Sequence, residues 1–164
     1  MILTPTGLRF HGRKLPCSIG KGGVKADKRE GDGATPAGIH KIVGMYYRPD
    51  RIRALQDWAT PIGNMDLWSD ASGDQQYNLH VRRPYDKSHE VLRRSDPLYD
   101  LILVTDYNWP NAVAGKGSAI FIHQWRRPGW PTEGCIAFQR DHLRWIAERI
   151  EPGTRVIVPE AMSD

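Results

Sequence analysis

Two short, continuously apolar runs constrain most strongly how this chain of 164 residues folds. Residues Leu101–Val104 read LILV, and residues Ala119–Ile122 read AIFI. Runs of apolar side chains without polar alternation are typical of central strands that are covered on both faces. We therefore expect the two runs to lie in the middle of a sheet and to form the core.

Turn-forming residues divide the rest of the chain into short segments. The chain contains 16 Gly and 12 Pro, which favours a fold with many turns over a helical bundle. Short segments with β-branched or aromatic residues between Gly, Pro, Asn or Asp predict strands. They are Leu15–Ile19, Gly38–Tyr46, Leu79–Arg82, Leu101–Tyr107, Ser118–His123, Cys135–Phe138 and Arg155–Val158. We expect a mainly β fold, a sandwich or barrel with one or two peripheral helices.

One segment, Asp141–Ile150, has the pattern of an amphipathic helix. Asp141 is suited to cap its start, and Gly153 follows its end. Weaker patterns predict a second helix over Asp50–Trp58 and a short one over His89–Arg94. The apolar residues of the first segment recur at helical spacing: Leu143, Ile146, Ala147 and Ile150.

The chain shows no internal repeat and no low-complexity linker, so we interpret residues 1–164 as a single domain. An irregular polar stretch between Trp58 and Gln76 predicts a long surface loop that helps to shape a cleft. The sequence contains neither the hydrophobic core of a signal peptide nor a membrane-spanning apolar segment. As written it predicts a cytoplasmic protein, or a periplasmic one if the native N-terminus was trimmed.

Charge and cysteine content narrow the range of partners. The 23 Lys and Arg against 19 Asp and Glu give a net charge of +4. This charge fits an anionic small substrate and is too diffuse to indicate nucleic acid. Cys17 and Cys135 are too few for a disulfide framework and too far apart for a metal knuckle. We interpret Cys17 as structural. We expect no cofactor, no nucleic-acid partner and no membrane partner. The sequence does not indicate an oligomeric state.

A histidine and a cysteine flank a loop that is rich in Trp, Arg and Pro. His123 ends one apolar run, and Thr132-Glu133-Gly134 turns into Cys135 at the start of the next predicted strand. If the two strands are neighbours, His123 can take the thiol proton and leave a thiolate with a pKa below the free value of about 8.5. Gly134 permits a tight turn, so the amides of Gly134 and Cys135 can form an oxyanion hole.

The same pattern has plainer interpretations. A cysteine at the start of a strand is often a buried packing residue. A zinc site built from Cys135, His123 and another histidine is disfavoured, because no further ligand stands at the usual spacing. The glycine before Cys135 and the polar, aromatic loop strengthen the catalytic interpretation. The group that orients the imidazole is not legible from the spacing.

Several segments together resemble one enzyme family. The family has a histidine that ends one strand and a Ser/Thr-His-Gly-Cys turn that follows it. This chain has a similar pattern in Ile122-His123 and Thr132-Glu133-Gly134-Cys135-Ile136. Residues 20–23 (GKGG) and 30–38 (EGDGATPAG) are similar to an upstream glycine and Thr-Pro-x-Gly segment. The likeness covers about residues 15–158 of this chain. Within that range, residues 77–78, 89–96 and 115–118 are similar to segments of a bacterial branch of the family. The chain thus resembles the L,D-transpeptidase catalytic domain, also called YkuD-type.

The resemblance implies a β-sandwich or barrel-like domain that acts on stem peptides of bacterial peptidoglycan, with Cys135 as nucleophile and His123 as general base. In such enzymes the cysteine attacks the carbonyl at the L-centre of diaminopimelate, expels the terminal D-alanine and forms a thioester. Water then completes an L,D-carboxypeptidase cycle, or the amine of a second stem makes a cross-link.

We expect hydrolysis and a role in cell-wall peptide recycling, because the sequence as written has no export signal and a polymeric wall would not lie beside it. The alternative within the class is an L,D-transpeptidase that forms peptidoglycan cross-links. The alternative of another class is an inactive module that binds cell-wall fragments.

Substrate binding is expected from basic and aromatic residues. Stem peptides carry several carboxylates, which guanidinium groups bind bidentately. We select Arg94 because it lies in a segment that resembles the family, Trp125 as a wall of the cleft, and Asn108 as a hydrogen-bonding group. Glu133 stands where the family has a histidine, and we keep it as a binding position without that imidazole's role. Ala137 replaces an Arg or Asn that is frequent in relatives. The arginine pairs that offer replacements are Arg82-Arg83, Arg93-Arg94 and Arg126-Arg127.

Overall fold

The two apolar runs lie at the centre of the main sheet. The computed structural model describes residues 1–161. Strand β12 (Leu101–Thr105) is buried along its whole length, between β7 (Gly38–Tyr47) and β13 (Phe121–Gln124). Both neighbours pair with it in the antiparallel direction, and all four residues of the run from Ala119 to Ile122 are buried. The expected position of both runs is therefore confirmed.

Ten strands of residues 1–161 form the main sheet, whose order is β3-β2-β1-β15-β7-β12-β13-β14-β4 with β8 paired to β7. The end strands β3 and β4 are separated in the chain by Pro16 alone, and the sheet forms a nearly closed barrel. The expected mainly β, barrel-like fold is confirmed. The further bounds are β1 Ile2–Thr4, β2 Gly7–Phe10, β3 Arg13–Leu15, β4 Cys17–Ser18, β8 Thr60–Pro61, β14 Ile136–Phe138 and β15 Arg155–Val158.

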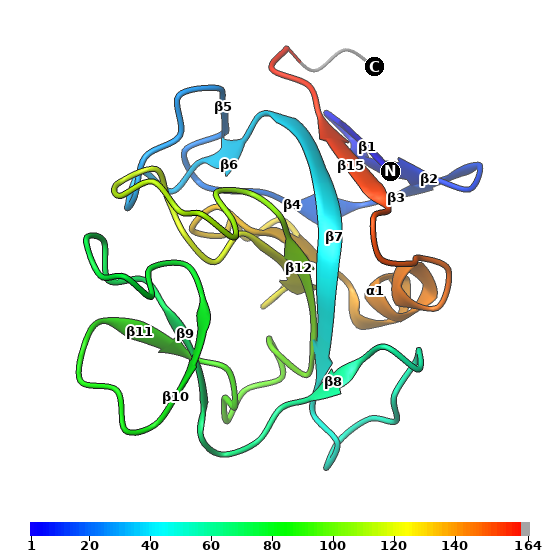
Figure 1. Cartoon of the computed structure of the whole chain (residues 1–164). Coiled ribbons are helices and arrows are strands. Elements are labelled where there is room, and N and C mark those ends of the chain that lie inside the picture. Colours follow the sequence, from blue (N-terminus) through cyan, green and yellow to red (C-terminus); the bar gives the residue numbers. More distant parts are fainter. Residues whose placement is uncertain (162–164) are drawn as a thin grey trace.

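Two smaller sheets lie beside the barrel. Strands β9 (Asp66–Ser69), β10 (His80–Arg82) and β11 (His89–Val91) form an antiparallel sheet in the order β10-β9-β11. Strands β5 (Val24–Lys25) and β6 (Thr35–Pro36) form a parallel pair. Figure 1 shows the three-stranded sheet as a lobe on the side of the long strand β7 opposite to the helix α1 (Arg140–Ala147).

Helix α1 confirms the strongest helical pattern and corrects its ends. Its residues Leu143, Ile146 and Ala147 are buried. The prediction that Asp141 caps the helix is wrong, because the Leu143 N–H already bonds to the Gln139 carbonyl at 2.9 Å. Gln139 is therefore the N-cap, and Asp141 lies within the first turn.

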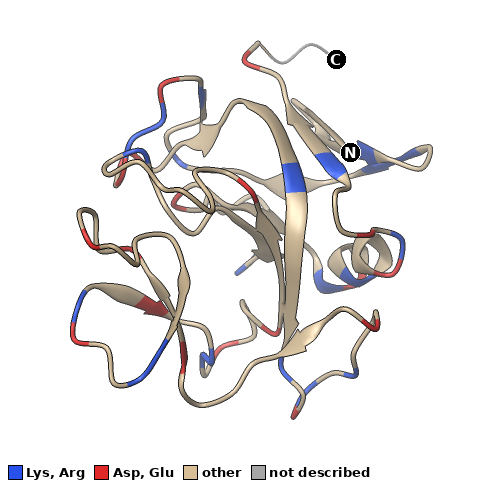
Figure 2. Cartoon of the chain, viewed as in Figure 1, with Lys and Arg blue, Asp and Glu red and all other residues tan. Residues whose placement is uncertain are grey.

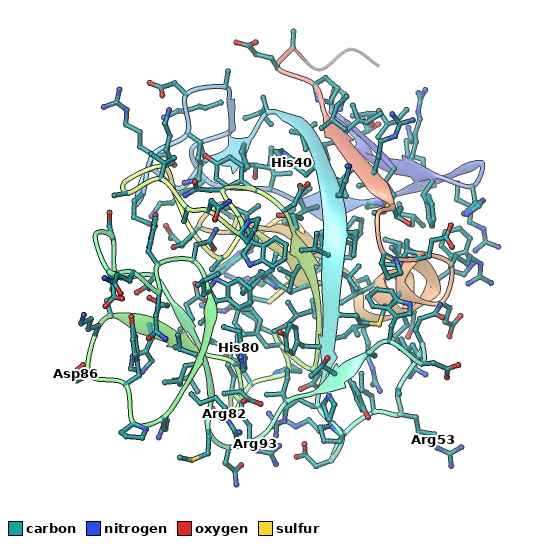
Figure 3. The ribbon with its side chains drawn as sticks, in the orientation of Figure 1. His40, Arg53, His80, Arg82, Asp86 and Arg93 are labelled. Atoms are coloured by element: carbon teal, nitrogen blue, oxygen red, sulfur yellow. The ribbon has the colours of Figure 1, made fainter. Side chains whose placement is uncertain are left out.

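The two weaker helix predictions are wrong. Residues Asp50–Trp58 form turns, because their charged side chains bind other loops: Arg51 donates to the carbonyl oxygens of Ser95 and Asp96. The exposed Arg53 extends outward from this loop (Figure 3). The predicted helix His89–Arg94 begins instead with β11, since pairing with β9 satisfies its backbone groups.

Strand ends differ from the prediction where the backbone is irregular. The predicted strand Leu15–Ile19 is interrupted at Pro16, so that Leu15 ends β3 and Cys17 begins β4. The predicted strand Ser118–His123 begins only at Phe121, because Ala119 has a left-handed φ of 50°. The irregular stretch between Trp58 and Gln76 is not one long loop, since it contains β8 and β9.

The apolar residues form two cores. The larger one packs α1 against the inner side of the main sheet and includes Leu103, Ile122 and Phe138. The smaller one, with Trp68 and Phe121, joins the three-stranded sheet to the barrel and includes Cys135. No helix within residues 1–161 is long and apolar enough to cross a membrane. The single-domain interpretation extends to residues 162–164, which lie outside the described residues.

Candidate active site

A cavity of about 500 Å³ lies between β11 and the loop that joins β13 to β14. His123 and Cys135 both line it, together with the three predicted binding residues Arg94, Trp125 and Glu133. Further residues of its wall are Glu90, Tyr99, Arg126 and Trp130. The structure thus brings together most of the residues selected from the sequence.

The sheet register turns the two predicted catalytic side chains to the same face. Strands β13 and β14 are parallel neighbours in which His123 stands opposite Ala137. Cys135 precedes Ala137 by two residues, and side chains two positions apart in a strand share a face. The imidazole therefore reaches the cavity from β13, and the sulfur reaches it from the residue just before β14.

The Cys135 thiol is buried and hydrogen-bonded. Its Sγ donates to the Ala119 carbonyl at 3.2 Å and accepts from the Phe121 N–H at 3.4 Å. Burial raises the pKa of Cys135 to about 12, and the nearby Glu90 adds to this effect. The expected thiolate with a lowered pKa is therefore wrong for the free protein, because removal from water disfavours the charged form.

A buried asparagine fixes the carbonyl that accepts the thiol proton. Ala119 has a φ of 50°, and its N–H donates to Asn78 Oδ1 at 2.9 Å. The same oxygen accepts from Trp68 Nε1 at 3.0 Å. Asn78 Nδ2 donates to the carbonyls of Tyr107 at 3.0 Å and Asn108 at 2.7 Å. Because Asn78 uses both ends of its amide, it fixes the turn that leads into β13.

The main chain orients the His123 imidazole. His123 Nδ1 lies 2.7 Å from the Gln124 carbonyl oxygen. A carbonyl has no proton to give, so Nδ1 carries the hydrogen and Nε2 keeps its lone pair. Burial lowers the pKa of His123 to about 4, which leaves the ring neutral near pH 7. The orienting group is a backbone atom, which explains why residue types did not reveal it.

These protonation states define what the pair can do. At neutral pH the site holds a protonated thiol and an unprotonated imidazole nitrogen in one cavity. Such a pair supports general-base catalysis, in which the proton leaves sulfur as the sulfur attacks a carbonyl. The arrangement is suited to acyl transfer.

The turn before Cys135 is held by hydroxyl groups. Thr132 Oγ1 donates to the Cys135 carbonyl at 2.6 Å and accepts from the Gly134 N–H at 3.2 Å. Thr35 Oγ1 donates to the Gly134 carbonyl at 2.8 Å and accepts from the Gly20 N–H at 2.9 Å. The upstream glycine and Thr-Pro segments therefore support the cysteine turn from behind.

Only glycine fits at position 134. Its φ is +140°, and a Cβ would lie 2.8 Å from the Ala34 carbonyl oxygen. The Gly134 N–H is engaged by Thr132, so one member of the predicted amide pair takes part in the turn. The oxyanion hole of Gly134 and Cys135 stays a prediction.

Arg94 and Glu133 line the cavity with their charges already partnered. Arg94 Nε and Nη2 donate to the two carboxylate oxygens of Asp96 at 2.9 and 2.6 Å. Its guanidinium carbon lies 5.2 Å from the centre of the Tyr99 ring. Glu133 is exposed and pairs with Lys21 at 2.8 Å.

Asn108 is the predicted binding residue that the structure does not bring to the cavity. Its Nδ2 donates to the carbonyls of Val113 at 3.1 Å and Gly117 at 2.8 Å, and its Oδ1 accepts from the Val113 N–H at 2.8 Å. These bonds brace the loop after β12. Asn108 thus lies outside this cavity, and its role in substrate binding stays a prediction.

The other arginines divide between the cavity and the surface. Arg82 and Arg93, labelled in Figure 3, lie outside the cavity and pair with Asp66 at 3.5 Å and Asp50 at 3.2 Å. Arg126 lines the cavity. Figure 2 shows basic and acidic positions interspersed over the loops and outer strands, consistent with the diffuse charge expected from composition. In residues 1–161 no group of three or more His, Cys, Asp or Glu residues is placed to hold a metal ion.

Sequence reasoning missed Glu90 and Tyr99. The Tyr99 hydroxyl donates to Glu90 Oε2, and the Tyr99 ring lies edge-on to His123 with ring centres 5.3 Å apart. Burial raises the pKa of Glu90. The available signal is that Glu90 belongs to a segment that resembles the family, although the sequence pattern predicts a helix there.

Comparison with known proteins identifies the family of the chain. A search of curated proteins gave no match. The family model of the L,D-transpeptidase catalytic domain, YkuD, matches residues 7–158 of the 164 and so includes both His123 and Cys135. The chain therefore belongs to the L,D-transpeptidase catalytic domain family, whose members are cysteine enzymes of peptidoglycan.

Proposed function

We propose that the protein is an L,D-carboxypeptidase that removes the terminal D-alanine from peptidoglycan stem tetrapeptides. The observation that carries this proposal is the cavity that holds the Cys135 thiol together with a neutral His123, whose Nε2 is free of hydrogen. Family membership supports the substrate class.

The first half-reaction forms a thioester. His123 Nε2 takes the proton from Sγ while the sulfur attacks the carbonyl carbon at the L-centre of diaminopimelate. The tetrahedral intermediate collapses, the C–N bond breaks, and the imidazolium returns the proton to the departing D-alanine nitrogen. The acyl group is left on Cys135, and the imidazole is again neutral.

The second half-reaction uses water. His123 Nε2 takes a proton from water as its oxygen attacks the thioester carbonyl, and the C–S bond then breaks. The sulfur recovers the proton, and the tripeptide leaves with a new carboxylate. The Gln124 carbonyl stabilises the imidazolium that forms in each half-reaction, because it accepts the hydrogen on Nδ1.

The size and charge of the cavity support a single peptide substrate. A volume of about 500 Å³ lies within the range of about 300–1,000 Å³ that is typical of pockets for one small ligand. Arg94 and Arg126 line it, and guanidinium groups bind the carboxylates that stem peptides carry.

The test is incubation with L-Ala-D-Glu-diaminopimelate-D-Ala, with and without an acceptor amine, followed by mass spectrometry. We expect tripeptide and D-alanine without acceptor, and neither product from Cys135→Ala. Products that form only with acceptor would instead make the protein a cross-linking L,D-transpeptidase. If no product forms in either case, the carboxypeptidase proposal is wrong and an inactive binding module is favoured.

A further inference from the structure

One carboxyl group in the cavity has no counterion. Glu90, on β11, lines the same cavity as Cys135 and accepts a hydrogen bond from the Tyr99 hydroxyl. No Lys, Arg or His within residues 1–161 forms an ion pair with it. A carboxylate accepts about four hydrogen bonds, so Glu90 keeps most of its capacity for a ligand.

The charge of Arg94 acts on Glu90, but the two side chains form no ion pair. Arg94 lines the cavity, but its Nε and Nη2 are both bound to Asp96. The other cavity glutamate, Glu133, is neutralised by Lys21 at 2.8 Å. Glu90 is therefore the acidic group at this wall that lacks a basic partner within the described residues.

A half-buried carboxylate without a basic partner is costly, and a purely structural role does not require a charge there. Burial is the main cause that raises the pKa of Glu90, and the negative charges of Asp70 and Glu30 add to it, whereas the Tyr99 hydrogen bond and the Arg94 charge lower it. A ligand ammonium group would compensate the charge that the protein leaves unmatched.

The cavity also offers a positive group beside this negative one. Arg94 follows β11 by three residues, and within the described chain its Nη1 donates to no other residue. The cavity thus presents a carboxyl group and free guanidinium hydrogens from the same short segment. That pairing matches a side chain that carries both an ammonium and a carboxylate.

We propose that Glu90 is a specificity residue that binds the ammonium group at the side-chain end of the substrate's diamino acid, while Arg94 binds the adjacent carboxylate. The inference rests on the proposed function and deepens it, because the D-centre of diaminopimelate carries these two groups. Glu90 selects substrates with a free side-chain amine over acylated ones.

The test compares the stem tetrapeptide with the same peptide acetylated at the side-chain amine of diaminopimelate. For the unmodified protein, acetylation lowers kcat/KM about 10- to 100-fold, as expected for one lost charge-assisted hydrogen bond. Glu90→Gln lowers kcat/KM for the free-amine peptide by a similar factor, mainly through KM, and changes turnover of the acetylated peptide little. Glu148→Gln makes the same chemical change on the exposed end of α1 and leaves both peptides unaffected.

Two kinetic results would overturn the proposal. If Glu90→Gln lowers kcat equally for both peptides, Glu90 acts on the chemical step through Tyr99 and His123 instead. If Glu90→Gln leaves kcat/KM unchanged for both peptides, the carboxyl group binds no part of the substrate.

A binding measurement separates this inference from the proposed function. Calorimetry with Cys135→Ala protein, checked for folding by circular dichroism, measures affinity for the two peptides without turnover. We expect the free-amine peptide to bind about 10- to 100-fold more tightly, and Glu90→Gln in the same background to remove the preference. That outcome supports the subsite even if the unmodified protein releases no D-alanine. Equal affinity for both peptides, or no binding of either, would overturn it.

Discussion

At the scale of single residues, burial sets the chemistry of the site. The Cys135 thiol donates a hydrogen bond to the Ala119 carbonyl, and His123 Nδ1–H donates one to the Gln124 carbonyl. Both groups are neutral in the free protein, because removal from water disfavours a thiolate and an imidazolium alike. The nucleophile is therefore activated during the reaction.

Replacement of Cys135 by Ala separates catalysis from packing. The substitution removes the only sulfur in the cavity wall of the described residues and is expected to abolish D-alanine release. The free energy of unfolding changes by about 1 kcal/mol, since one buried atom with two weak hydrogen bonds is lost. Urea unfolding and product analysis check the two effects. Retained activity with a large loss of stability would reverse the assignment.

The alkylation rate of Cys135 should depend steeply on pH. The thiolate is the reactive form, and a pKa of about 12 keeps its fraction rising about tenfold per pH unit between pH 7 and 10. Peptide mapping after iodoacetamide treatment distinguishes Cys135 from Cys17. A rate that is already constant between pH 7 and 8 would indicate a preformed thiolate–imidazolium pair, contrary to this account.

At the scale of elements, the turn between β13 and β14 depends on a distant segment. The Thr35 hydroxyl joins Gly20 to Gly134, and Gly134 lies against the Ala34 backbone. The position of Cys135 is thus fixed by residues about one hundred positions earlier in the chain.

Thr35→Val tests this support. The change removes both hydrogen bonds of the hydroxyl and is expected to lower the free energy of unfolding by about 1–3 kcal/mol. D-alanine release should fall at least about tenfold, because misplacement of the nucleophile slows the attack. Thr35→Ser keeps the hydroxyl and should retain most of the stability and most of the rate of D-alanine release. Equal activity in the two variants would show that the turn does not need this bond.

The sequence predicted elements well where side-chain pattern and burial agree. The apolar run at Leu101–Val104 and the strand Arg155–Val158 are found where expected. The prediction for His89–Arg94 failed because pairing with β9 outweighs a weak local helical pattern. The proposed nucleophile and base, Cys135 and His123, are recognisable by residue type. The orienting Gln124 carbonyl and the packing of Tyr99 against His123 arise only from tertiary contacts.

At the scale of the whole molecule, one asparagine joins the three-stranded sheet to the barrel. Asn78 accepts hydrogen bonds from Trp68 of β9 and from Ala119 ahead of β13, and it donates to the chain after β12. The cavity wall on the β11 side and the cysteine on the barrel side are thereby held in one arrangement.

Asn78→Ala should disturb both parts at once. The substitution removes the four hydrogen bonds of the Asn78 side chain, which is buried. We expect it to lower the free energy of unfolding by about 2–4 kcal/mol. D-alanine release at a permissive temperature should fall as well, since Ala119 no longer positions the thiol. Asn64→Ala, at an exposed position, is the matched control and should cost less than about 0.5 kcal/mol. Equal stability of the two variants would contradict the bridging role.

The central claim is that Cys135 carries the acyl group of the stem peptide during turnover. The most direct measurement is mass spectrometry of protein quenched in acid during reaction with the tetrapeptide, followed by peptide mapping. We predict a mass increase equal to the tripeptide acyl group on the peptide that contains Cys135, and its disappearance as substrate is exhausted. D-alanine release accompanied by an adduct at another residue would contradict the account.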